Sequence, residues 1–242
     1  MEQIQLSKRL QRLTSYIPSH AKTLSDIGSD HAYLPCYAYQ KGLINRAIAG
    51  EVNEGPFQSA LRTVQSLGLE KAISVRLGDG LAVIDRGETD VVVIAGMGGS
   101  LIRKILDEGS HKLTRETTLI LQPNVASDTV REWLSSNGWT ITNEDIIEED
   151  GHIYEMLISS QTAQPVNLSE IECLMGPFLL QKQDKIFAKK WAIELQKVKN
   201  ILKSLDKTEQ TEEILQKKQQ FNKKAALIER GLHWDNSFMD KP

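Results

Sequence analysis

Short apolar runs alternate with helical patterns along the first 160 residues. Between the runs, apolar residues recur at helical spacing, for example over residues 57–67 and 125–137. An opening amphipathic helix places Leu6, Leu10, Leu13 and Ile17 on one face. The apolar and β-branched runs lie at residues 23–27, 47–50, 73–77, 91–95 and 119–121. Short buried runs with helices between them predict a parallel sheet that is covered on both faces.

The last two extended segments follow a different pattern. Residues 139–147 and 153–159 are separated only by Glu148-Glu149-Asp150-Gly151. An acidic turn ending in Asp-Gly favours an antiparallel hairpin. Five parallel strands and this hairpin predict an α/β fold with a seven-stranded, doubly wound, Rossmann-like sheet.

The rest of the chain has another character. Residues 159–168 are polar and contain Pro165, which is typical of a linker. Beyond them, apolar residues at alternating spacings of four and three predict two helices paired as a coiled-coil-like hairpin: Trp191, Leu195, Val198, Leu202 and Leu205, then Ile214, Phe221 and Ile228. The sequence therefore predicts two domains, residues 1–160 and 161–242.

Composition indicates a folded protein of the cytosol. The chain is 40% hydrophobic and 25% charged with a net charge of −3, which argues against disorder. No apolar run reaches the roughly 18 residues of a membrane span, and residues 1–8 do not look like a signal peptide. Cys36 and Cys173 are far apart, so we expect reduced thiols, no disulfide and no metal site. We therefore expect a cytoplasmic protein without membrane contact, and no obligate protein partner is evident.

Candidate chemistry gathers where four predicted strands end. Ligands of doubly wound sheets bind at the carboxyl ends of the strands, near the switch in strand order. One glycine or one Asp there can be a tight turn or a helix cap, but four such loops on one edge indicate a nucleotide-type ligand. The residues that we expect to bind it are Asp26, Gly28, Ser29, Asp30, His31, Glu51, Val52, Asn53, Gly78, Asp79, Gly80, Ala95, Gly96 and Met97.

The residue types favour a ligand without phosphate. In a dinucleotide fingerprint the second glycine approaches the pyrophosphate, but Asp30 stands at that position, and the chain has no P-loop. S-adenosylmethionine carries a sulfonium, an ammonium and a ribose, which suit a carboxylate-rich pocket. Glu51 follows Asp26 at about the distance expected for the residue that binds the ribose hydroxyls. Asp79, between two glycines, is placed to meet an adenine amino group.

The chain resembles the bacterial TrmK-type tRNA (adenine-22, N1)-methyltransferases. The resemblance rests on D-I-G-S-D-H-A-Y-L-P at 26–35, A-G-E-V-N at 49–53, G-D-G-L at 78–81, A-G-M-G-G at 95–99 and L-Q-P-N at 121–124. It continues through Glu149-Asp150 and Tyr154-Glu155 into the Lys/Gln-rich tail and covers nearly the whole chain. It implies a Rossmann-like methyltransferase domain, a C-terminal coiled-coil-like domain, S-adenosylmethionine as methyl donor and tRNA as substrate.

Methylation of adenine N1 needs no general base, because N1 carries an in-plane lone pair and no hydrogen. The enzyme must align the reacting atoms and manage the charge that moves from sulfonium to base, and Asp30 is our candidate catalytic residue. Gly98 and Gly99 offer a small shelf for a flipped base, and we also assign Tyr33 and Asn124 to substrate binding. Tyr33 either stacks on a base or packs, and a His at a helix start, such as His31, is more often structural than catalytic.

RNA contacts are expected to be electrostatic and local. Residues 161–242 hold 14 basic and 11 acidic groups, a net of +3, whereas residues 1–160 have a net of −6. We assign tRNA contacts to Lys8, Arg9 and Arg12 on the first helix and to Lys182, Lys185 and Lys189, which helical spacing places on one face. The alternative is an ordinary solvated lysine face. Two other functions stay open: the same fold acting on another substrate, and a non-catalytic RNA-binding module that keeps the pocket.

Overall fold

The computed structural model describes residues 4–162 and 166–234. The chain forms two compact units, residues 1–167 and 168–242. The division after residue 167 lies within the predicted linker of residues 159–168. β7, the last strand among the described residues, ends at Gln161.

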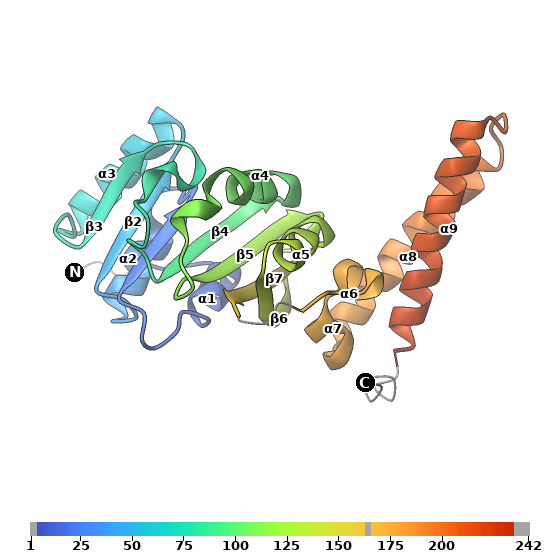
Figure 1. Ribbon diagram of the computed structural model, residues 1–242. Coiled ribbons are helices and arrows are strands. Elements are labelled where there is room, and N and C mark those ends of the chain that lie inside the picture. The colour runs from blue at the N-terminus through green and yellow to red at the C-terminus, as the bar shows by residue number, and fades with distance from the viewer. Residues whose placement is uncertain (1–3, 163–165, 235–242) are drawn as a thin grey trace. The chain divides into compact units, whose positions relative to one another are not determined.

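The first unit is built on a seven-stranded sheet with the order β3-β2-β1-β4-β5-β7-β6 (Figure 1). β1 to β5 run parallel, and β7 pairs antiparallel with both β5 and β6. The predicted doubly wound sheet is confirmed, with its switch in strand order between β1 and β4. The strands are β1 (Thr23–Ile27), β2 (Arg46–Glu51), β3 (Ile73–Leu77), β4 (Val91–Gly98), β5 (Thr118–Val125), β6 (Trp139–Glu149) and β7 (His152–Gln161).

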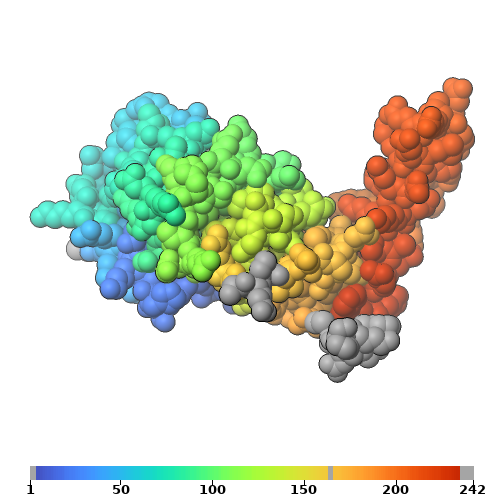
Figure 2. Space-filling model, viewed as in Figure 1, coloured from blue at the N-terminus to red at the C-terminus, as the bar shows by residue number. Residues whose placement is uncertain are grey.

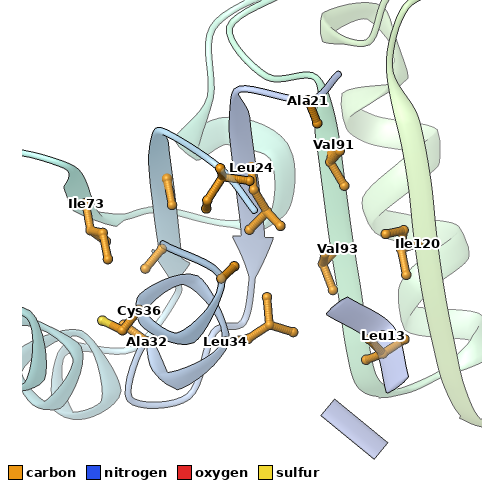
Figure 3. Close-up of a cluster of buried hydrophobic side chains, with 14 of the residues drawn as sticks. Leu13, Ala21, Leu24, Ala32, Leu34, Cys36, Ile73, Val91, Val93 and Ile120 are labelled. Carbon is orange, nitrogen blue, oxygen red and sulfur yellow. The ribbon is translucent and has the colours of Figure 1, made fainter. Parts of the chain in front are cut away.

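Helices cover both faces of this sheet. α1, α2 and α3 share one buried cluster with the central strands, and right-handed connections place α4 and α5 on the other face (Figure 1). Within the cluster, the buried Leu13 of α1 lies close to Val93 and Ile120 (Figure 3). The helices of this unit are α1 (Lys8–Thr14), α2 (Tyr33–Gln40), α3 (Glu54–Ser66), α4 (Gly99–Gly109) and α5 (Ser127–Ser136), with short 3₁₀ turns η1 (Gly80–Val83) and η2 (Ser110–Lys112).

The hairpin of β6 and β7 is closed and held by polar residues. Asp150 and Gly151 both have positive φ, 50° and 76°, as the two-residue turn favoured by Asp-Gly requires. Arg131 of α5 is fully buried and bridges the two strands, with its Nε 2.6 Å from Glu144 and its Nη2 3.0 Å from Glu155. Because buried charges need such partners, this triad fixes α5 to the hairpin.

In the second unit, the structure describes residues 168–234, with the helices α6 (Glu170–Met175), α7 (Pro177–Lys182), α8 (Lys185–Leu205) and α9 (Glu212–Leu232). Lys199 pairs with Glu229 and Lys218 with Asp206, so α8 and α9 run antiparallel and form an elongated hairpin (Figures 1 and 2). Trp191 and Val198 are buried as the spacing predicts. Supercoiling of the pair stays a prediction. No described helix of either unit is both long and apolar enough to span a membrane.

The expectation that Lys182, Lys185 and Lys189 share one helical face is wrong. Lys182 ends α7, and the next residue, Gln183, adopts a left-handed conformation with φ 44°. Asp184 then caps α8 by accepting a hydrogen bond from the backbone N–H of Phe187. The sequence spacing of these lysines fits a single helix equally well, so helical periodicity alone cannot reveal the break between α7 and α8.

Candidate active site

The carboxyl ends of β1, β2, β3 and β4 meet at one edge of the sheet, and the predicted loops follow them there. Ser29 closes the first loop by donating its hydroxyl to Asp26 Oδ2 over 2.6 Å. Asp26 is 5% exposed, and burial raises the pKa of its carboxyl to about 7, with the neighbouring Glu51 adding to the shift. A cation bound beside Asp26 would relieve this cost and favour the carboxylate.

Glu51, at the end of β2, ties the first two loops together. Its Oε1 accepts a hydrogen bond of 2.5 Å from the backbone N–H of Asp30. The N–H groups of Gly28 and Ser29 donate to the carbonyl of Gly50 at 2.9 and 3.2 Å. Burial raises the pKa of Glu51, while the hydrogen bond from Asp30 opposes that shift. The position of the Asp30 loop therefore depends on Glu51.

The loop between β1 and α2 is left-handed over three consecutive non-glycine residues. Asp30, His31 and Ala32 have φ of 41°, 71° and 58°, a conformation that costs energy and is often found at functional sites. The Asp30 side chain is 84% exposed and lies 3.5 Å from His31 Nε2. The His31 ring stacks on Tyr33 with centroids 5.2 Å apart. This turn presents an exposed carboxylate and an aromatic pair at the edge of the sheet.

The loop after β3 is more open. Asp79 is exposed, and the backbone N–H of Gly78 donates to the carbonyl of Glu51 over 2.8 Å. Gly80 has φ 50° and packs against Ile105, so it serves the turn into η1. Beside this loop, Val52 is 57% exposed and is followed by the exposed Asn53, the N-cap residue of α3.

The side chain of Met97, at the end of β4, lies against the first loop. A Cβ on Gly28 would lie 2.2 Å from Met97 Cε, so glycine is needed where the two loops meet. The pairing of β4 with β5 shifts register after Ala95 and again after Met97, which makes the predicted loop part of an irregular strand.

Two side chains from β5 fix this irregular segment. Gly96 has φ 77°; its N–H donates to Gln122 Oε1 at 3.2 Å, and its carbonyl accepts from Asn124 Nδ2 at 2.8 Å. Gln122 Nε2 in turn donates to Asn124 Oδ1 at 3.1 Å.

Two further glycines assigned to substrate binding differ in surroundings. Gly98, half-buried, pairs with Val125, the exposed last residue of β5. Gly99 is buried, and a Cβ there would lie 2.0 Å from the carbonyl oxygen of Ala126. The close approach of the α4 start to Ala126 explains this glycine without a substrate contact.

The first helix lies against this site. The carboxylate of Glu149 accepts hydrogen bonds from the backbone N–H groups of Lys8 and Arg9, and Asp145 pairs with Arg12. The guanidinium of Arg9 donates to Gln122 Oε1 over 2.5 Å and lies 5.2 Å above the ring of Tyr154. Arg9 is thus placed at the edge of the active site, and Arg12, half-exposed, is held by a carboxylate.

Sequence reasoning assigned no site role to Gln122, Tyr154, Asp145 or Glu149. One signal was present: Gln122 is a polar residue that directly continues an apolar strand, and the structure buries it completely. A buried amide needs partners, which could have suggested the contacts described above. Nothing local in the sequence indicates that Arg9 would reach Gln122.

The arrangement suits a cationic nucleoside without phosphate. Two buried carboxylates, Asp26 near the end of β1 and Glu51 at the end of β2, stand on adjacent strands. β4, the neighbour of β1 on its other side, contributes backbone and the thioether of Met97. Among the residues that the structure describes, no group of three or more His, Cys, Asp or Glu side chains could hold a metal ion.

Comparison with known proteins gives a consistent result. A family model described as tRNA (adenine(22)-N(1))-methyltransferase matches residues 24–230. The Bacillus subtilis (strain 168) protein of that name is 44% identical over 232 residues, covering 94% of this chain and 97% of the relative.

Solved structures of relatives are similar to this chain over nearly its whole length. The crystal structure of the B. subtilis tRNA methyltransferase TrmK has a TM-score of 0.91 at 43% identity, over 95% of this chain and 100% of that one. A putative tRNA (m1A22) methyltransferase of Streptococcus pneumoniae in complex with S-adenosyl-L-methionine has a TM-score of 0.84 at 39% identity, over 95% and 100%. Mycoplasma capricolum TrmK in complex with S-adenosyl-homocysteine has a TM-score of 0.83 at 26% identity, over 94% and 98%.

Proposed function

Because the chain belongs to the TrmK family of tRNA (adenine(22)-N(1))-methyltransferases, we propose that it transfers the methyl group of S-adenosylmethionine to N1 of adenine 22 in tRNA. The observation that carries the proposal in the structure is the convergence of the Asp26, Glu51 and Met97 loops on one edge of a methyltransferase-type sheet. Their carboxylates and backbone suit the donor named in the complex of the S. pneumoniae relative.

We assign donor binding to the residues of the four loops. Glu51, already hydrogen-bonded to the Asp30 backbone, is placed to accept from the ribose hydroxyls, and Asp26 supplies the negative charge that faces the donor's cationic groups. Asp79, exposed on the third loop, is assigned to the adenine amino group. Gly28 lets Met97 approach, which brings the segment from Ala95 to Gly98 over the donor site.

The donor supplies an electrophilic methyl group, and the protein supplies alignment. The N1 lone pair attacks the methyl carbon as the carbon–sulfur bond breaks, so positive charge leaves sulfur and appears on the base. No proton has to be removed in this step. Asp30 offers an exposed carboxylate at the edge of the site, where it can accept a hydrogen bond from the adenine amino group and stabilise the cationic product. Tyr33 and Asn124 are assigned to holding the base.

The test of the function is methyl transfer from labelled S-adenosylmethionine to unmodified tRNA, followed by nuclease digestion and mass spectrometry. We expect one 1-methyladenosine at position 22 and no label in a protein extract. Label in protein instead of tRNA would indicate a different substrate of the same fold. Donor binding without transfer to either would indicate an RNA-binding module that keeps the pocket. An Asp30→Asn variant keeps size and loses charge, so it should fold and bind donor while its turnover falls.

We further infer that tRNA is held by local basic surfaces. In the second unit, Lys185 and Lys189 lie on α8 and Lys182 ends α7. Replacing these three lysines with Gln should weaken tRNA binding and flatten its salt dependence, by somewhat less than about 1 in the log–log slope per lost phosphate contact. An unchanged affinity and slope would leave recognition to Lys8, Arg12 and the rim of the pocket. With tRNA as its substrate, the enzyme is expected to work in the cytoplasm.

A further inference from the structure

Arg9 differs from the other basic residues of α1 because its charged group points into the active-site edge. Its Nη1 donates to Gln122 Oε1 over 2.5 Å, and its guanidinium covers the ring of Tyr154. Gln122 is completely buried and also accepts from the N–H of Gly96 with the same oxygen. One amide oxygen therefore joins the first helix to the segment at the end of β4.

Both backbone polar groups of Gly96 are hydrogen-bonded to side chains of β5. Its N–H donates to Gln122, and its carbonyl accepts from Asn124. Asn124 is itself hydrogen-bonded to Gln122. Glycine adopts many backbone conformations, including a left-handed φ of 77°, so these contacts select one of them beside the register shift. Without Arg9, the Gln122 amide would lose one of the two donors to its oxygen and would be held only by Gly96 and Asn124.

The helix that carries Arg9 is itself firmly placed. Glu149 accepts from the first two N–H groups of α1, Asp145 binds both Arg12 and Tyr16, and Leu13 is buried in the core beside Ile120 (Figure 3). Such anchoring gives the guanidinium a fixed position, which a phosphate-binding arginine on a solvated face would not need.

We propose that Arg9 is a positioning residue for methyl transfer, which acts through Gln122 to hold Gly96 and the neighbouring Met97 in place over the donor. This makes α1 part of the catalytic apparatus, beyond any contact it makes with RNA. The inference rests on the proposed function for its kinetic part only, because the conformation of the Gly96 segment can be measured without turnover.

The kinetic test compares Arg9→Gln, Arg9→Lys and Gln122→Ala with the parent on unmodified tRNA. Misplacement of a reacting group by about 1 Å can cost about 100-fold in rate, so we expect Arg9→Gln to lower kcat by about 10- to 100-fold, with less than about a threefold change in the KM for tRNA. Arg9→Lys keeps one donor and should recover part of kcat. The double variant Arg9→Gln/Gln122→Ala should be no slower than the worse single variant, since residues that act through one another are not additive.

The structural test is amide hydrogen exchange of residues 95–98 in the parent and in Arg9→Gln, without substrate. The Gly96 N–H should exchange faster in the variant. Arg86→Gln is the matched control: it also removes one guanidinium, but from an exposed residue that precedes β4 at the opposite edge of the sheet, so exchange and kinetics should match the parent.

Three results would overturn the proposal: unchanged exchange at Gly96, a raised KM for tRNA at unchanged kcat, or additive losses in the double variant. The second would make Arg9 a direct tRNA contact. A parent enzyme that does not methylate tRNA would contradict the proposed function but leave the exchange result to decide the role of Arg9.

Discussion

Donor affinity should depend on pH through Asp26. Its pKa is raised to about 7, chiefly by burial, so in the free protein the neutral form dominates below that pH. A cationic donor binds the carboxylate form in preference. With a pKa of about 7, the ionised fraction rises from about 9% at pH 6 to about 91% at pH 8, so affinity should rise about tenfold, or about 1.4 kcal/mol.

The measurement is calorimetric titration with S-adenosylmethionine at pH 6, 7 and 8 for the parent and for Asp26→Asn. The donor's sulfonium keeps its charge over this range, and effects of the donor's amino group that do not depend on Asp26 cancel in the ratio of the two affinities. The parent-to-variant ratio should therefore rise about tenfold from pH 6 to pH 8. Asp85→Asn removes an exposed carboxylate that precedes β4, at the opposite edge of the sheet, and its ratio to the parent should stay near one.

A parent-to-variant ratio that is the same at pH 6 and pH 8 would refute this reasoning, because the Asp26 carboxyl would then not change its charge on donor binding. The free protein offers an independent check of the sign. The folded-state pKa of Asp26 lies above its ordinary value of 3.8, so the folded state binds the extra proton between these values. Asp26 thus makes the free energy of unfolding fall as pH rises from about 4 to about 7. Asp26→Asn should remove that part of the slope in urea titrations.

Three further changes test separate parts of the structure. Glu51→Ala should weaken donor binding by roughly 1.5–3 kcal/mol, the value of a hydrogen bond to a charged group, and unchanged affinity in calorimetry would remove Glu51 from the site. Gly99→Ala places a methyl group against the Ala126 carbonyl and should lower stability by about 1–3 kcal/mol; a parent-like melting temperature would contradict that packing. Arg131→Met leaves two carboxylates buried and should cost about 3–5 kcal/mol in urea unfolding, whereas a neutral result would mean that water reaches the triad.

The sheet and the position of the candidate site could be predicted because both depend on local signals. A buried strand needs a continuous apolar run, and the residues that follow it are polar or glycine wherever the chain must turn. Glu51 and Asp79 stand out as candidates because each comes within two residues of the end of such a run, and Asp150-Gly151 marks the hairpin because the turn needs two positive φ angles.

Other parts depend on contacts between distant segments and could not be predicted. Arg9 has the same sequence surroundings as a solvated helical arginine, and only the fold brings it to Gln122, 113 positions along the chain. The end of α7 at Gln183 could not be predicted, because the left-handed conformation of this residue has no counterpart in the sequence spacing of the surrounding lysines. The close approach of Gly99 to Ala126 likewise needs two elements in place before it exists.

The contact between Glu149 and the start of α1 also sets an order of events during synthesis. The two segments are 141 positions apart in the chain, so α1 is synthesised long before its partner. At roughly 5–20 residues per second, the ribosome needs roughly 7–28 s to make the intervening chain. Until then α1 has no anchor on the hairpin, while the strands that carry Asp26 and Glu51 are already available to pair. The nascent protein can thus pair the strands that carry Asp26 and Glu51 before Glu149 fixes the first helix, and with it Arg9, in place.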